Sequence, residues 1–280
     1  MSTIQTVRPS PIAGSWYPGT EKELRSQVSE FLKQATPPQV PGELLGLISP
    51  HAGYIYSGPT AAYSYRLVQG KSYDTVVIAS PLHEYLPYPF LTTAHESYAT
   101  PLGEVPVATD LIEKMIATMG KSIGSNLIAV ANDREHSLEI QLPFLQVALA
   151  KPFRLLPLMV RENNAMSLKT FGETLASVVQ GQNVLLVAST DLSHFYSEKQ
   201  ANKLDEHMMK QFAAFSPEGV LQAEAEQSGF ACGSGAVAVI LWAARALGGK
   251  QVTLLHHSTS ADTTHDNSNV VGYGAAAISK

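Results

Sequence analysis

Apolar runs of strand-like composition end in chemically reactive side chains at three places in this sequence. The first run begins at residue 44 and ends in His51, the second begins at residue 74 and ends in His83, and the third begins at residue 183 and ends in Asp191 and His194. Imidazole and carboxylate groups are common metal ligands and acid–base catalysts. In open α/β sheets, ligands bind beyond the carboxyl ends of the strands, where loops converge on a rigid base. We therefore expect the functional site at these strand ends.

A single cysteine, Cys232, lies in a glycine-flanked segment that leads into an apolar helix predicted for residues 236–247. Helix N-termini and, when present, metal ions stabilise thiolates, so we expect Cys232 to be a thiolate near neutral pH. One cysteine excludes an internal disulfide, and the sequence therefore gives no sign of an oxidising compartment. The thiol is available for metal binding or for catalysis.

Two kinds of chemistry fit these residue types. A metal ion could be bound by two or more of four side chains, His51, His83, His194 and Cys232. No short-range ligand pair of the His-x-x-x-His kind fixes such a site. Alternatively, Cys232 could act as a nucleophile with a histidine as its base. Distances along the sequence do not decide between these alternatives. A lone histidine is more often structural than functional, and we expect a structural role for His95, His207, His256 and His257.

Strand-like and helix-like segments alternate along the chain with no linker between them. This alternation is typical of an α/β protein whose sheet is covered by helices on both faces. We therefore predict a single domain over residues 1–280 with a mixed, largely parallel central sheet. One helix is expected at residues 59–68, with proline in its first turn. Another is expected to open at Asp133, which would place His136 and Glu139 on one helix face.

Composition excludes several classes of function. The chain has 280 residues, with 19 Lys and Arg against 24 Asp and Glu, a net charge of −5, and scattered basic residues. It lacks the basic patch of a nucleic-acid-binding protein. No run of about 18 apolar residues could span a bilayer, and the N-terminus lacks the apolar core of a signal peptide. We expect a soluble, cytoplasmic protein.

Seven short motifs occur in order along nearly the whole chain: Gly14-Ser-Trp-Tyr17, Ser49-Pro-His51-Ala-Gly-Tyr-Ile-Tyr-Ser-Gly58, Pro81-Leu-His83, Glu135-His-Ser-Leu-Glu-Ile-Gln-Leu-Pro143, Ser189-Thr-Asp-Leu-Ser-His194, Cys232-Gly and Val270-Val-Gly-Tyr273. Together they resemble the Memo family (mediator of ErbB2-driven cell motility). Bacterial and archaeal members of that family are often called AmmeMemoRadiSam system protein B. No single motif is decisive, but seven in the same order are highly specific.

The resemblance implies an αβα sandwich similar to the extradiol (class III, LigB-like) non-haem iron dioxygenases. It also implies a metal site whose ligands fall on His51, His83 and Cys232. In the dioxygenases the third ligand is a glutamate, and a thiolate is a softer ligand that favours iron(II), copper(I) or zinc. We expect iron(II), with copper or zinc as alternatives.

The resemblance implies further roles around the metal. His194 and Asp191 would be catalytic residues in the same pocket, with Asp191 holding the imidazole of His194 or contacting the substrate. Trp16 and Tyr54 would bind the substrate near the mouth of the pocket. From the residues alone, Asp191 could instead cap the helix after it, and Trp16 could simply cover the core.

The expected function is that of a redox or oxygen-dependent enzyme acting on an unknown small molecule. Three protein ligands leave a coordination position open, which is typical of reactive rather than structural metal sites. The alternative is a non-catalytic module that binds a peptide or metabolite in the same pocket, because animal Memo proteins are associated with recognition of phosphorylated peptides. Family association also implies two protein partners, a radical SAM protein and an AMMECR-type protein.

Overall fold

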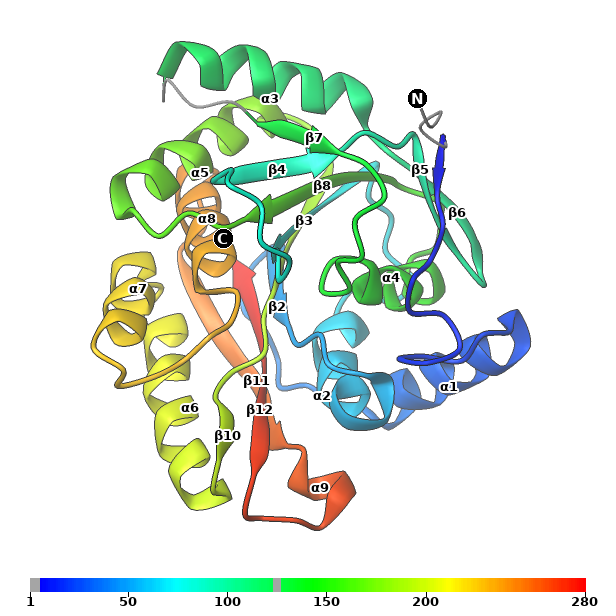
Figure 1. Cartoon of the computed structure of the whole chain (residues 1–280), viewed down its shortest axis with the longest axis vertical. Helices are drawn as coiled ribbons and strands as arrows, with labels where there is room; N and C mark the ends of the chain where they lie inside the picture. The colour runs from blue at the N-terminus through cyan, green and yellow to red at the C-terminus, as the bar shows by residue number, and fades with distance from the viewer. Residues whose placement is uncertain (1–5, 123–126) are drawn as a thin grey trace.

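A computed structural model describes residues 6–122 and 127–280 of the chain (Figure 1). Most strands come from the apolar runs of the sequence, because apolar and β-branched side chains pack well in a sheet that is buried on both faces. The strands are β1 (Val7–Arg8), β2 (Leu44–Ser49), β3 (Thr75–Pro81), β4 (Phe90–Thr93), β5 (Ser97–Thr100), β6 (Gly103–Pro106), β7 (Ile128–Val130), β8 (Arg154–Val160), β9 (Val184–Ser189), β10 (His194–Tyr196), β11 (Gln251–Thr259) and β12 (Val270–Ser279).

The large sheet is mixed and has a parallel centre. Its strand order is β10-β12-β2-β9-β3-β8-β4-β7, and β11 also pairs with β12. The central strands β2, β9, β3 and β8 run parallel to one another, as do β4 and β7. By contrast, β4 is antiparallel to β8, and β12 is antiparallel to β2, β10 and β11. The prediction of a mixed α/β sheet is confirmed, but its parallel part is smaller than expected. The short connection between β11 and β12 allows only antiparallel pairing.

Helices cover both faces of this sheet (Figure 1). On one face α2 packs against the strands, with α1 and α4 beside it; on the other face α8 packs against the strands, with α5, α6 and α7 around it. The helix α8 is buried along most of its length, as expected for a helix that is apolar on all sides. The helices are α1 (Glu21–Gln34), α2 (Tyr54–Arg66), α3 (Thr109–Ser122), the 3-10 helix η1 (Glu139–Gln141), α4 (Leu142–Ala148), α5 (Ala165–Val179), α6 (Glu198–Ala213), α7 (Pro217–Ala225), α8 (Ser234–Ala246) and α9 (Ala261–Thr264).

The helix predicted for residues 59–68 begins earlier, at Tyr54. Pro59 therefore lies inside α2, where it has no N–H to donate to the carbonyl of Ile55. The hydroxyl of Thr263 donates to that carbonyl instead, at 3.0 Å. A tertiary contact thus replaces the missing helical hydrogen bond, so the helix can include the proline.

The helix expected to open at Asp133 does not form there, and the residues before Glu139 form an irregular loop. The guanidinium of Arg8 in β1 is the reason. It donates to the Asp133 carboxylate at 2.8 Å, to the Glu139 carboxylate at 2.6 Å and to the backbone carbonyls of Asp133 and Glu135. Carbonyls that accept from Arg8 are not aligned for helical hydrogen bonds. His136 consequently lies on a loop rather than on a helix face.

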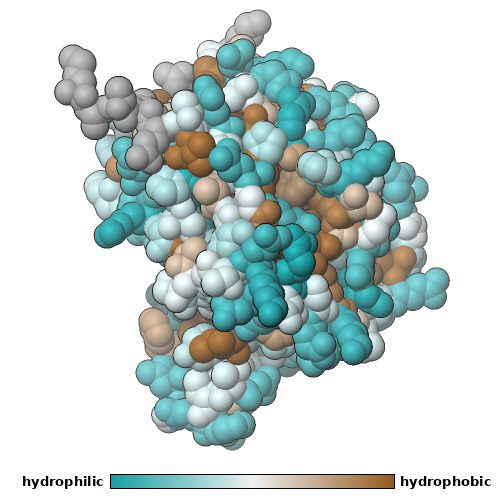
Figure 2. Space-filling model, turned by 90° about the vertical axis from the view of Figure 1, so that its right-hand side faces the viewer, coloured by the Kyte–Doolittle hydropathy of each residue, from teal (hydrophilic) through white to brown (hydrophobic). Residues whose placement is uncertain are grey.

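A small second sheet of order β1-β5-β6 lies beside the large one and carries Arg8. On the face shown in Figure 2, hydrophobic side chains form separate patches within a mainly hydrophilic surface. Among residues 6–122 and 127–280, every helix is too short or too polar to cross a membrane.

Candidate metal centre

The strand order brings the predicted site residues to one edge of the sheet. β9 lies between β2 and β3 and is parallel to both, so the carboxyl ends of the three strands meet. His51 follows β2, His83 follows β3 and Asp191 follows β9. Residues that are far apart in the sequence thus become neighbours.

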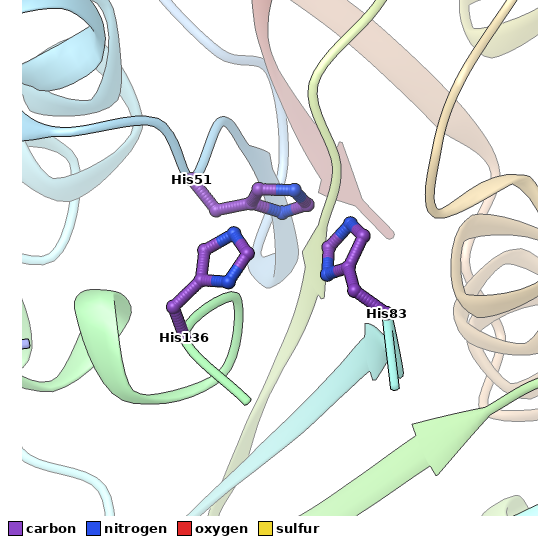
Figure 3. A group of neighbouring side chains, drawn as sticks. All are labelled: His51, His83 and His136. Carbon is purple, nitrogen blue, oxygen red and sulfur yellow. The ribbon is translucent and has the colours of Figure 1, made fainter. Parts of the chain in front are cut away.

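Three imidazoles face one another at this edge: His51, His83 and His136, called the histidine cluster below (Figure 3). One ring nitrogen from each lies within 4.8 Å of the others. The rings of His83 and His136 are stacked with centroids 4.7 Å apart, and the ring of His51 meets both edge-on at 5.5 Å. His136 was not predicted as a ligand, because the sequence around it predicts the start of a helix rather than a strand end. The signal that could have found it is the polar character of this segment.

Hydrogen bonds fix the tautomer of His51. Its Nδ1 lies 3.0 Å from Ser189 Oγ. The Ser189 hydroxyl donates to the carbonyl of Ser137 at 2.6 Å and accepts from Gln141 Nε2 at 2.7 Å. Because its one proton is used, this hydroxyl can only accept from His51, so Nδ1 carries the ring proton. The other nitrogen, Nε2, therefore presents a lone pair that can bind a metal.

Glu135 orients His83 in a similar way. One carboxylate oxygen accepts from the His83 backbone N–H at 2.6 Å, and the other lies 3.0 Å from His83 Nδ1. The hydrogen bond to Glu135 raises the pKa of His83. Burial opposes ionisation of the carboxyl, but hydrogen bonds from His83 and Ser137 hold the pKa of Glu135 well below its usual range. Since Nδ1 donates to Glu135, His83 Nε2 is the ring nitrogen left for a ligand.

Burial keeps two members of the histidine cluster neutral near pH 7. Burial and the neighbouring charge of His83 lower the pKa of His51 to about 3. Burial and the charge of His51 lower the pKa of His136 to about 4. The side chain of His51 is 2% exposed, whereas those of His136 and His83 are 19% and 41% exposed. Neutral imidazole is the form that binds metal ions, and the exposed side of the cluster gives access to it.

Cys232 lies beside the cluster, just before α8. Its Sγ is 3.2 Å from His51 Nε2 and accepts from the backbone N–H of Asp191 at 3.3 Å. A side chain on Gly233 would come within 2.4 Å of the Ser189 carbonyl oxygen, so glycine permits this approach. Burial and the negative charge of Asp191 raise the pKa of the Cys232 thiol. The prediction of a thiolate is therefore wrong for the metal-free protein, because these two effects outweigh the helix N-terminus.

Asp191 lies on the turn that follows β9, and His194 is the first residue of β10. Asp191 does not cap a helix, because the chain continues into β10; its Oδ1 accepts from the His51 backbone N–H at 2.7 Å. Burial raises the pKa of Asp191 to about 6. His194 Nδ1 donates to the carbonyl of Leu192 at 2.8 Å. That carbonyl, rather than Asp191, therefore fixes the tautomer of the neutral His194 ring, in which Nε2 is the nitrogen with the lone pair.

Trp16 and Tyr54 line a cavity of about 600 Å³ next to the cluster. The ring of Trp16 contacts that of His136, with centroids 4.1 Å apart. The Trp16 carbonyl accepts from the backbone N–H of Tyr54 at 2.8 Å, and the Tyr54 hydroxyl donates to the carbonyl of Ile140 at 2.7 Å. A cavity of this size accommodates a small molecule.

The histidines that were expected to be structural lie outside the cluster. His95 is buried and its Nε2 accepts from a backbone N–H at 3.1 Å, His256 stacks on Tyr63, and His257 pairs with Asp205 at 2.8 Å. His207 is exposed on α6.

The fold and the site define an α/β protein with a cluster of three histidines at the carboxyl ends of its parallel strands. The sequence matches the family of Memo-like proteins over residues 8–277, and the chain belongs to this family. It is 34% identical to a MEMO1 family protein of Nitrosopumilus maritimus over 273 residues, which cover 96% of this chain and 98% of that protein. It is 32% identical to a MEMO1 family protein of Methanopyrus kandleri over 278 residues, which cover 96% of this chain and 97% of that protein.

The crystal structure of an uncharacterised protein from Escherichia coli K12 has a similar fold. The TM-score is 0.53 at 13% sequence identity, and the match covers 83% of this chain and 99% of that one. At this identity the likeness shows the fold alone.

Proposed function

We propose that this Memo-like protein is a metal-dependent redox enzyme that acts on a small molecule. The observation that carries the proposal is the convergence of three imidazoles, with ring nitrogens within 4.8 Å of one another, beside a cavity. Structural metal sites are closed by four protein ligands, whereas reactive sites keep a position open. The 41% exposure of the His83 side chain gives a small molecule access to the cluster.

The proposed ligands are His51, His83 and Cys232, with iron(II) as the metal and copper or zinc as alternatives. Both histidines fit this role, because each has its Nδ1 in a hydrogen bond and its Nε2 available. Cys232 fits through its contact with His51 Nε2, and a bound cation would stabilise its thiolate against burial. His136 competes for the third position as a member of the histidine cluster. When bound, iron or copper supplies Lewis acidity and one-electron redox chemistry.

The chain's own residues would bind the substrate and move protons beside the metal. With Nδ1 donating to the carbonyl of Leu192, His194 can accept a proton at Nε2, as a general base must. Asp191, with its pKa raised to about 6, can exchange a proton near neutral pH. Trp16 and Tyr54 would hold the substrate in the cavity that they line.

Finer parts of the proposal rest on the sequence resemblance. These are a single Memo-like domain over residues 1–280, kinship with the extradiol (LigB-like) dioxygenases, and correspondence to AmmeMemoRadiSam system protein B. With that correspondence, the partners would be a radical SAM protein and an AMMECR-type protein in the cytoplasm. Co-purification of the tagged chain with either partner tests this part.

Metal analysis of anaerobically purified protein tests the ligand set. The wild type should bind iron stoichiometrically, and His51→Ala and His83→Ala should lose it. Cys232→Ser should weaken binding while His136→Gln retains the metal; the opposite result would give the third position to His136. The exposed His207→Gln variant is the control. If the wild type and His51→Ala contain the same substoichiometric amount of metal, the proposed metal site does not exist.

Oxygen uptake separates an enzyme from a binding module. Metal-loaded protein with a reductant or a phenolic substrate should consume oxygen, which a binding module does not. His194→Ala should keep the metal and lose about 10²–10⁴-fold in turnover, the usual contribution of general acid–base catalysis. If His194→Ala instead loses the metal as His51→Ala does, His194 is a ligand and the assignment of Cys232 fails.

A further inference from the structure

The ring of His194 is oriented by a peptide group of the turn before it. His194 Nδ1 donates to the carbonyl of Leu192 at 2.8 Å, so Nε2 is the nitrogen with the lone pair in the neutral ring. The Leu192 carbonyl and the Ser193 N–H belong to one planar, trans peptide group and therefore point in opposite directions. Whatever holds the Ser193 N–H also sets the direction of the carbonyl that orients His194.

Asp205 of α6 holds this peptide group from the other side. Its Oδ1 accepts from the Ser193 backbone N–H at 2.9 Å, and both residues are fully buried, so water does not replace this bond. The neighbouring backbone groups of the turn bond to β12. The Leu192 N–H donates to the Gly272 carbonyl, and the Gly272 N–H donates to the Ser193 carbonyl, both at 2.8 Å. Asp205 is thus the side chain that fixes the peptide between Leu192 and Ser193.

A glycine gives Asp205 room to reach the turn. Gly272 belongs to the Val270-Val-Gly-Tyr273 motif and lies in β12, against which α6 packs (Figure 1). A Cβ atom at position 272 would lie 1.9 Å from Asp205 Oδ2, and its three nearest heavy atoms would all belong to the Asp205 carboxylate. Even a methyl group at position 272 would therefore displace this carboxylate.

His257 pairs with the second oxygen of the same carboxylate. Its Nε2 donates to Asp205 Oδ2 at 2.8 Å, and its side chain is partly exposed whereas that of Asp205 is fully buried. A buried carboxylate is costly unless hydrogen bonds and an opposite charge compensate it. His257 of β11 is the side chain that meets this need, so the pair joins β11 and α6 to the turn that carries His194.

The orientation of His194 matters because this residue lies close to the histidine cluster. Burial and the nearby charges of His83 and His194 lower the pKa of His51, and such charge effects weaken with distance. A general base must lie within hydrogen-bond reach of the proton that it takes up. A ring of His194 that turned away from its present position would lose this reach.

We propose that Asp205 is a positioning residue that sets the orientation of His194 through the Ser193 N–H. His257 supports it by pairing with the carboxylate, and Gly272 supports it by leaving room for the carboxylate. This inference deepens the proposed function and rests on it for the role of His194 as a base. The contacts of Asp205 involve no metal, so the positioning role can be tested in metal-free protein.

Nitrogen NMR spectroscopy of the imidazole rings in metal-free protein tests the proposal. At alkaline pH, where histidine is neutral, the wild type should carry the His194 proton on Nδ1. Asp205→Ala should give a mixture of the two His194 tautomers, because the Leu192 carbonyl is then free to turn away. The ring of His51 is the internal control, since Ser189 fixes its tautomer. A wild-type tautomer of His194 in Asp205→Ala would overturn the proposal, as would a wild type with the proton on Nε2.

Two further variants separate positioning from a general loss of stability. Asp205→Asn keeps an oxygen that can accept from the Ser193 N–H, so it should restore the single tautomer of His194. Leu175→Ala removes a fully buried side chain from α5, and it should destabilise the protein without changing His194. The proposal is overturned if Asp205→Asn behaves like Asp205→Ala, or if Leu175→Ala also mixes the tautomers.

A double variant tests the role of the glycine. Gly272→Ala should mix the His194 tautomers and lower the midpoint of urea unfolding, because its methyl group displaces the Asp205 carboxylate. In the Asp205→Ala background the same substitution should lower the midpoint much less, since the atoms that the methyl group meets first are gone. Equal losses in the two backgrounds would show that Gly272 does not make room for Asp205, which overturns this part of the proposal.

Turnover and metal content separate this inference from the proposed function. Asp205→Ala should keep its iron and lose up to about 100-fold in oxygen uptake, because a displacement of about 1 Å can cost that much; Asp205→Asn should recover most of the loss. If the wild type binds no metal but Asp205→Ala mixes the His194 tautomers, the proposed function fails and the positioning role stands. If the wild type binds iron and consumes oxygen but Asp205→Ala keeps the single tautomer, the positioning role fails and the proposed function stands.

Discussion

The segment from Asp133 to Glu139 contributes to two buried polar clusters of opposite character. Toward β1, Asp133 and Glu139 surround the guanidinium of Arg8, which is 1% exposed. Toward the sheet edge, Glu135 and His136 join the histidine cluster. Both clusters contain residues of this one segment, but their buried polar groups are paired in different ways.

In the Arg8 cluster every charge has a partner. Arg8 donates to both carboxylates, and Glu139 also accepts from the hydroxyls of Ser10 and Tyr17 at 2.5 and 2.7 Å. In the histidine cluster the Nδ1 atoms of His51 and His83 are hydrogen bonded on the outer side, to Ser189 and Glu135, and the inner nitrogens face one another and the Cys232 thiol. A fully paired cluster fixes the loop, whereas converging lone pairs offer a site for a cation. The comparison separates the part that holds the site from the part that performs chemistry.

The largest expected effect comes from breaking the paired cluster. Arg8→Met should lower the free energy of unfolding by about 3–5 kcal/mol, because it leaves two buried carboxylates without their cation. The control is Arg154→Met, whose ion pair with Asp110 is exposed and should be worth about 0–1 kcal/mol. Urea unfolding of both variants measures the difference. Equal stability would show that the Arg8 cluster does not hold the loop.

Replacing each of the two glutamates of this segment by glutamine sharpens the comparison between the two clusters. Glu135→Gln weakens the group that orients His83, so metal affinity should fall about 10–100-fold. Glu139→Gln removes a charge paired with Arg8, so it should lower the midpoint of urea unfolding and leave metal affinity close to that of the wild type. Metal titration and urea unfolding of both variants test this. The division of roles is refuted if both substitutions weaken metal binding equally.

In metal-free protein, the histidine cluster makes the free energy of unfolding depend on pH. In the unfolded chain histidine titrates near 6.5, whereas the folded pKa values are about 3 for His51 and about 4 for His136. As the pH falls below 6.5, the unfolded chain therefore binds protons at these two histidines before the folded chain does. Their contribution to the free energy of unfolding is then lost. Asp191, with its pKa raised to about 6, acts in the opposite direction because the folded chain keeps its proton to higher pH.

His136→Gln should make the pH dependence shallower by about 1.4 kcal/mol per pH unit between pH 6 and about 4.5, the contribution of one proton. Urea unfolding at several pH values measures this slope. The exposed His207→Gln variant should keep the slope of the wild type, and an unchanged slope in His136→Gln would mean that His136 titrates normally.

The smallest expected effect concerns the thiol beside the cluster. In metal-free protein at neutral pH, iodoacetamide should alkylate Cys232 much more slowly than a free thiol, because burial and Asp191 raise its pKa. Asp191→Asn should increase the rate by a few-fold by removing the negative charge, and bound iron should block the reaction. Alkylation of the wild type at the rate of glutathione would show an ionised, accessible thiol.

Local patterns were sufficient for most of the elements and for the strand-end residues. Continuous apolar runs predicted the strands that precede His51, His83 and Asp191, because full burial demands apolar side chains whatever the neighbouring strand is. Patterns failed where a distant residue changes local hydrogen bonding. The hydroxyl of Thr263 allows α2 to include Pro59. The hydrogen bonds of Arg8 prevent the helix expected at Asp133 from forming there.

The sequence by itself determined that imidazole, carboxylate and thiol groups end buried strands or open a helix, since burial and glycine placement are encoded locally. Only the tertiary structure decided which of them meet. The pairing of β9 with both β2 and β3 brings His51, His83 and Asp191 together, and the loop held by Arg8 adds His136. Strand order and loop docking depend on contacts between residues more than a hundred positions apart, as in the bond from Arg8 to Asp133, and no local pattern records them.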